Sequence, residues 1–103
     1  MTIATYAVTT ATGNAYTSSG NTAITSLTLC NWGAGNVTAN LFVVPNGSSP
    51  TSSNQMIYAL PLTTGDTYQI YQAAEKLLLG PNDMIQIDAS ANSVTAITSF
   101  TSI

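Results

Sequence analysis

The sequence predicts an all-β protein, a single antiparallel β-sandwich or jelly-roll-like domain of roughly eight strands. Short segments in which apolar and polar residues alternate recur along the chain, and this period of two is typical of strands with one buried face. Clusters of Gly, Pro, Asn and Ser separate these segments at similar spacing, as turns do. With 103 residues and no repeat or linker, one domain over residues 1–103 is expected.

The N-terminal part begins with an alternating segment, residues 1–8, that predicts a first strand. Residues 9–21 are polar and form either a long loop or a short edge strand around residues 15–17. Residues 24–44 predict two strands that pair as a hairpin, because Leu and Val alternate there with Ser, Thr and Asn. The turn of this hairpin, residues 31–36, contains residues that tolerate positive φ.

Residues 45–54 are the clearest loop, because their two prolines cannot join a ladder of hydrogen bonds. The next predicted strand, residues 55–62, places Met56, Tyr58, Leu60 and Leu62 on one face and Ile57 and Ala59 on the other. Pro61 indicates that this strand lies at a sheet edge or ends there. A tight turn is expected at residues 63–66.

Residues 67–79 are compatible with two structures. Tyr68, Tyr71, Ala74, Leu77 and Leu78 fall at helical spacing, and the flanking Asp and Gly could cap a helix. The alternative is a strand at 67–71, a helical turn at 72–75 and a strand at 76–79. Because every other element is a strand, we expect the second structure.

The last two predicted strands alternate clearly. In residues 84–89, Ile85 and Ile87 are expected to point inward. Residues 94–103 close the chain, with one face made by Val94, Ala96, Thr98 and Phe100.

Charged residues are rare, at 5% of the chain against about 25% in typical proteins. Lys76 is the only basic residue, so neither nucleic acid nor an anionic membrane surface is an expected partner. A net charge of −3 on so few groups leaves a nearly neutral surface. Such a surface suits permanent packing against other subunits, although a free β-domain with a hydroxyl-rich exterior is the alternative.

The residue types for catalysis are missing. The chain has no histidine and a single cysteine, Cys30, which excludes a Ser-His-Asp triad and a zinc site of several Cys or His ligands. Asp83 and Asp88 should lie on opposite faces of their strand, which disfavours a glycosidase pair, and no Asp-rich loop indicates Ca²⁺. We therefore expect no enzyme and no cofactor. Cys30 is expected to be a small apolar filler, with a reactive thiol as the alternative.

The N-terminal residues lack the features of a signal peptide, and no apolar run is long enough to span a membrane. The chain is therefore expected to be made and kept in a cytosol.

Interface anchors are the remaining functional candidates. The indole of Trp32, at the tip of the predicted hairpin, is either folded over a neighbouring strand or buried in a partner. Tyrosines can anchor an interface in the same way or line a sugar-binding face. The candidate interface residues are Trp32, Asn46, Tyr58, Tyr68 and Tyr71.

Residues 24–103 carry several short motifs in order: Leu-Cys-Asn at 29–31, Val-Pro-Asn-Gly at 44–47, Thr-Gly-Asp-Thr-Tyr at 64–68 and Glu-Lys-Leu at 75–77. With a closing valine-containing strand, this pattern resembles a family of small virion structural proteins of tailed bacteriophages. Gln-Ala-Ala at 72–74 looks longer than the usual turn at that point. The motifs are structural and carry no active site.

The resemblance implies a non-enzymatic virion structural protein, a β-sandwich that acts as a capsid decoration or cement protein bridging capsomers. Its partners would be the major capsid protein or other virion subunits, together with copies of itself, with a trimer favoured. Its location would be the virion, assembled in the cytoplasm of the bacterial host. The alternative is a component of the phage neck, baseplate or tail fibre that contacts host glycans.

Overall fold

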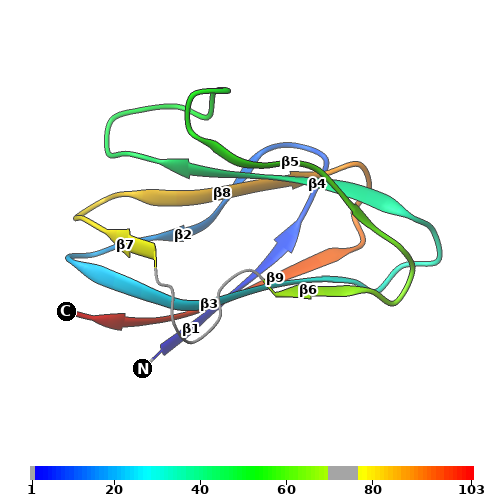
Figure 1. Ribbon diagram of the computed structural model, residues 1–103, viewed down its shortest axis with the longest axis horizontal. Helices are drawn as coiled ribbons and strands as arrows, with labels where there is room; N and C mark the ends of the chain where they lie inside the picture. Colours follow the sequence, from blue (N-terminus) through cyan, green and yellow to red (C-terminus); the bar gives the residue numbers. More distant parts are fainter. Residues whose placement is uncertain (1, 70–76) are drawn as a thin grey trace.

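The computed structural model describes residues 2–69 and 77–103, and these form nine strands and no helix. The all-β prediction is confirmed. Of the two alternatives for residues 9–21, the short edge strand is confirmed as residues 13–17, and it brings the number of described strands to nine. The strands shown in Figure 1 are β1 (Thr2–Val8), β2 (Gly13–Thr17), β3 (Thr22–Asn31), β4 (Val37–Val44), β5 (Gln55–Leu62), β6 (Thr67–Gln69), β7 (Leu77–Leu79), β8 (Met84–Ala89) and β9 (Val94–Ser102).

Two antiparallel sheets pack face to face as a β-sandwich. Sheet 1 has the order β1-β9-β3-β6, and β7 also pairs with β3. Sheet 2 has the order β2-β8-β4-β5. In Figure 1, β4, β5 and β8 of sheet 2 lie above β3, β6 and β9 of sheet 1.

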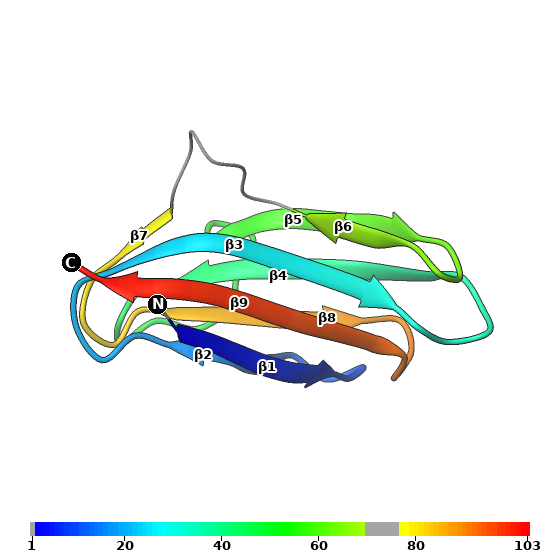
Figure 2. The same cartoon turned by 90° about the horizontal axis from the view of Figure 1, so that it is seen from below.

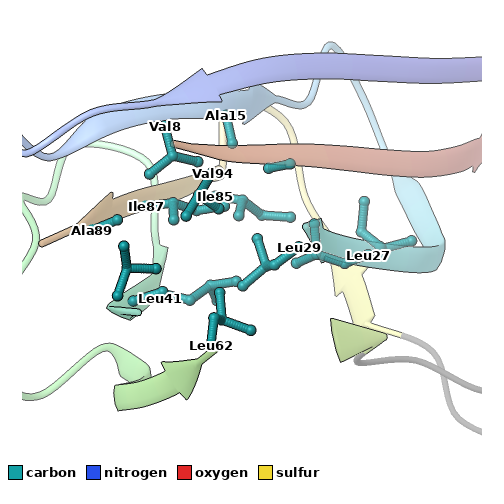
Figure 3. Packing of buried hydrophobic residues seen from close by; sticks show 14 of the residues in the cluster. Val8, Ala15, Leu27, Leu29, Leu41, Leu62, Ile85, Ile87, Ala89 and Val94 are labelled. Carbon is teal, nitrogen blue, oxygen red and sulfur yellow. The ribbon is translucent and has the colours of Figure 1, made fainter. Parts of the chain in front are cut away.

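The core fills the space between the sheets, where both contribute alternate residues (Figure 3). As predicted, Ile85 and Ile87 of β8 point inward, and the face of β9 that carries Val94 and Ala96 is the buried one. Burial of each large aliphatic side chain stabilises the fold by about 1.5–3 kcal/mol. The fully or nearly fully buried cluster also includes Val8, Ile24, Leu27, Leu29, Val37, Ala39, Leu41, Leu62 and Leu79.

The predicted hairpin of residues 24–44 is wrong, although both of its strands exist. β3 pairs with β9, β6 and β7 in sheet 1, whereas β4 pairs with β5 and β8 in sheet 2. Residues 32–36 therefore cross from one sheet to the other. Alternation shows that a strand has one buried face, but both sheets of a sandwich meet this condition, so alternation does not identify the pairing partner.

The predicted faces of β5 are also wrong, because the strand contains a bulge. Ala59 has a φ of 51°, and the pairing of β4 with β5 shifts at this point. Met56 and Tyr58 before the bulge point outward, whereas Leu62 after it is 2% exposed in the core. A bulge adds one residue to the strand and so exchanges its inward and outward positions. The predicted edge position of this proline-containing strand is confirmed, since β5 pairs only with β4.

The segment at 67–79 begins and ends as strands, so the helix alternative fails at both ends. The described parts of β6 and β7 are three residues each, and the remaining residues of the two predicted strands lie outside the described residues. The predicted helical turn at 72–75 and Tyr71 lie outside the described residues.

Candidate interaction surface

Three turns meet at one end of the sandwich, on the right in Figure 1. They are residues 32–36 between β3 and β4, residues 63–66 between β5 and β6, and residues 90–93 between β8 and β9. We call this region the turn end. Hydrogen bonds of one buried residue, made by its side chain and its backbone, hold the three turns together.

That side chain is Asn31, the last residue of β3, which is fully buried. Its Nδ2 donates to the carbonyl oxygens of Gly35 at 2.8 Å and Leu62 at 3.0 Å. Its Oδ1 accepts hydrogen bonds from the N–H of Gly33 and the Oγ of Ser93, both at 3.1 Å. Both donors and both acceptor positions of the amide are therefore used, which satisfies the buried group completely.

The backbone of Asn31 binds the turn at residues 63–66. Its N–H donates to the carbonyl oxygen of Asp66 at 3.0 Å, and its own carbonyl accepts from the N–H of Gly65 at 2.9 Å. Within the turn, the Asp66 Oδ2 accepts hydrogen bonds from the Oγ1 of Thr63 at 2.5 Å and from its N–H at 3.1 Å. The side-chain bond, followed by the backbone bond, lowers the pKa of Asp66 from its ordinary value because both stabilise the charged form.

Trp32 follows Asn31 and projects from these hydrogen-bonded turns. Its N–H donates to the carbonyl oxygen of Ser93 at 3.0 Å, and its side chain is 65% exposed. The next residue, Gly33, packs so closely that an added Cβ would lie 2.5 Å from the Cβ of Ser93. The chain needs glycine here for close approach, not for a positive φ, which among the described glycines occurs at Gly47 and Gly65. The indole is thus an exposed group on a firmly held backbone, and burial under a neighbouring strand is excluded.

An open hollow of about 200 Å³ lies beside the turn end, between the start of β4 and the end of β5. Its lining has no charged residue, so nothing there could serve as a general acid or base. The residues around it are Asn36, Val37, Thr38, Pro61, Leu62, Thr63 and Ser90.

The other candidate interface residues lie apart from Trp32. Tyr58 is 81% exposed on the outer face of sheet 2, and Tyr68 is 41% exposed on β6 of sheet 1. Asn46 follows β4 at the opposite end of the sandwich, where its N–H donates to the Oδ1 of Asp83 at 2.9 Å. The structure therefore does not gather these residues into one patch, and Tyr71 lies outside the described residues.

Tyr58 directly precedes the bulge at Ala59. The side chain of Asn40 on β4 stabilises this bulge by a hydrogen bond. The Asn40 Oδ1 accepts a hydrogen bond from the N–H of Ala59 at 2.8 Å, and its Nδ2 donates to the Asp88 Oδ1 at 2.7 Å. The other oxygen of Asp88 accepts from the Oγ1 of Thr12 at 2.7 Å. The carboxylate of Asp88 therefore connects β4, β8 and the β1–β2 connection, and it holds the Asn40 side chain that binds the backbone beside Tyr58.

Asp83 has a similar structural role at the other end. Its Oδ2 accepts from the N–H of Gly80 at 2.8 Å, so both of its carboxylate oxygens bind loop backbone. Among residues 2–69 and 77–103, no three His, Cys, Asp or Glu side chains lie close enough together to hold a metal ion. Cys30 is partly buried and has no disulfide partner.

Asn31, Asn40 and Asp83 are organising residues whose roles the sequence analysis did not identify. The alternation of β3 could have identified Asn31, because this residue points to the same side as the buried Leu27 and Leu29. A buried asparagine needs hydrogen-bond partners for its amide group.

Comparison of the chain with models of protein families, with curated proteins and with solved structures finds no match. Within the described residues, no helix long and apolar enough to cross a membrane is present.

Proposed function

We propose that the chain is a non-enzymatic structural subunit of a bacteriophage virion, a decoration or cement protein that bridges capsomers on the head. Its partners are the major capsid protein and other copies of the chain. The phage origin rests on the resemblance of residues 24–103, and the role as an assembly subunit rests on the surface of the sandwich.

The observation that carries the proposal is the outer face of sheet 1. Within the residues that the structure describes, none of the five strands of this sheet contains an Asp, Glu, Lys or Arg residue. Three large apolar side chains are exposed on these strands: Ile3 at 64%, Leu78 at 65% and Ile97 at 39%. The neighbouring outward positions carry hydroxyl groups, such as Thr5 and Thr28 on either side of Ile97.

Such a face is suited to permanent burial against another subunit. Charged groups cost much more to remove from water than hydroxyl or apolar groups, so this face can be covered with a small desolvation penalty. A permanent interface buries roughly 2,000 Å² in total, or about 1,000 Å² on each partner. That area is roughly a fifth of the 5374 Å² surface of the chain, so one sheet face and its rim would suffice.

Quantitative mass spectrometry of purified phage particles that encode the chain tests the proposal. A decoration protein should be present at a copy number comparable with that of the major capsid protein. A copy number far lower would identify a neck, baseplate or fibre component instead. Absence of the chain from purified particles would refute a virion role.

A further inference from the structure

The edge strand β1 has one hydrogen-bonding side without a partner. β1 pairs with β9 along its full length, from Thr2 opposite Phe100 to Val8 opposite Val94, with no shift of register. Beyond this ladder, no hydrogen bond within residues 2–69 and 77–103 involves the backbone of Thr2–Val8. Ile3, Thr5 and Ala7 are exposed. Figure 2 shows β1 at the margin of sheet 1, beyond β9.

The other edges of the two sheets are protected in ways that natural proteins use against unwanted pairing. β5 contains Pro61 and the bulge at Ala59. β2 has five residues and an irregular register at residues 14–16, and the described parts of β6 and β7 have three residues each. In contrast, β1 has seven residues with no proline, charge or bulge. Among the described strands, β1 is therefore the edge that remains open to another strand.

We propose that β1 pairs antiparallel with β1 of a second copy of this chain, about a two-fold axis at Thr5. Centring the pair on Thr5 uses all seven residues and joins the two copies of sheet 1 into one continuous sheet. It places Thr5 opposite Thr5, a favourable cross-strand pair, and the large Ile3 opposite the small Ala7. An identical partner is favoured because β1 has no charged residue. Two copies of a charged strand would place like charges opposite each other, whereas two copies of β1 do not.

This proposal rests on the geometry of β1 and does not depend on the proposed function. A two-fold edge pairing is closed after two subunits, so it predicts a dimer and not the trimer that the resemblance implies. A dimer of this kind also doubles the uncharged face of sheet 1.

Thr5→Lys tests the pairing through its charge. Because Thr5 lies on the axis, this variant places two ammonium groups opposite each other in the dimer, and sedimentation equilibrium should show at least tenfold weaker dimerisation. The matched control is Thr38→Lys, at an exposed position on β4 of sheet 2, which should dimerise like the unchanged chain. An unchanged chain that sediments as a monomer or a trimer, or a Thr5→Lys variant that dimerises normally, would overturn the proposal.

A crosslinking experiment tests the register, with Cys30→Ser as the background. Thr5→Cys should form a covalent dimer under mild oxidation, because residues opposite each other have Cα atoms about 4.5–5.5 Å apart, within disulfide range. Ala7→Cys should not, since the two copies of Ala7 would lie about 13 Å apart along the strands. Crosslinking of both variants to the same extent, or of neither, would contradict the register centred on Thr5.

Discussion

Replacement of Asn31 by alanine should destabilise the fold more than any exposed substitution at the turn end. The change removes four side-chain hydrogen bonds at once. Loss of the bond to the buried carbonyl of Leu62 costs about 0.5–1.5 kcal/mol. The groups of Gly35, Gly33 and Ser93 are partly buried, and each lost bond there costs roughly 0.5–1 kcal/mol because water can replace part of it. Together these lost bonds give an expected loss of about 2–4.5 kcal/mol.

Chemical denaturation measures this loss as a change in the free energy of unfolding. Thermal unfolding should show a Tm lower by at least about 8 °C, since 1 kcal/mol corresponds to roughly 4–8 °C in a domain of this size. Asn36→Ala is the matched control, because this exposed asparagine of the same turn accepts a single bond, from Thr64 N–H at 3.3 Å. The control should lose less than about 1 kcal/mol. An equally small loss in Asn31→Ala would refute the role of the buried amide.

Asn31→Asp distinguishes the contribution of the two hydrogen bonds that the side chain donates from that of the two that it accepts. The carboxylate keeps an acceptor for Gly33 and Ser93, but it would face the carbonyl oxygens of Gly35 and Leu62, which also accept. Burial and this repulsion raise the pKa of the introduced group in the folded state above its unfolded value. The variant should therefore be most stable at low pH and lose stability as the pH rises through the folded-state pKa. A flat stability profile would contradict the described contacts.

Three further predictions concern the same end of the molecule. Gly33→Ala should cost about 1–3 kcal/mol in denaturation experiments, because its methyl group would overlap Ser93. Trp32→Ala should change stability by less than about 0.5 kcal/mol, as exposed substitutions do, while weakening attachment to phage particles in a co-sedimentation assay. Thr63→Val removes the hydroxyl donor to Asp66, so an NMR titration should show the lowered pKa of this carboxyl rising toward its ordinary value.

Each of these predictions has a control or a contradicting result. Gly35→Ala should be tolerated, since nothing lies within 4 Å of its added Cβ. A large loss of stability in Trp32→Ala with unchanged attachment would show that the indole serves the fold. For Asp66, the lowered folded-state pKa means that its stabilisation is present above the unfolded pKa and is lost as the pH falls through the folded value. An unchanged titration midpoint in Thr63→Val would contradict the hydrogen bond.

The sequence was sufficient for the strands and for most of their buried faces. Ile85 and Ile87, or Val94 and Ala96, could be assigned inward because a strand turns alternate side chains to opposite sides. This periodicity depends only on the local backbone. Tyr58 was predicted as a candidate interface residue, and its side chain is exposed. The bulge at Ala59, which separates the outward Tyr58 from the inward Leu62, was not predicted. It depends on the pairing of β5 with β4, which the local sequence does not specify.

The partners of each strand and the contacts of the turn end were decided by the tertiary structure. β3 and β4 have the alternation of a hairpin, yet they join different sheets because their buried faces fit opposite sides of one core. Asn31 binds Leu62 and Ser93, which are 31 and 62 residues away in the chain. Residues 31–36 were predicted as a turn, but Asn31 is the last residue of β3 and shares the inward direction of Leu27 and Leu29. Only the packing of distant segments determined which groups satisfy it, since those groups meet when both sheets are in place.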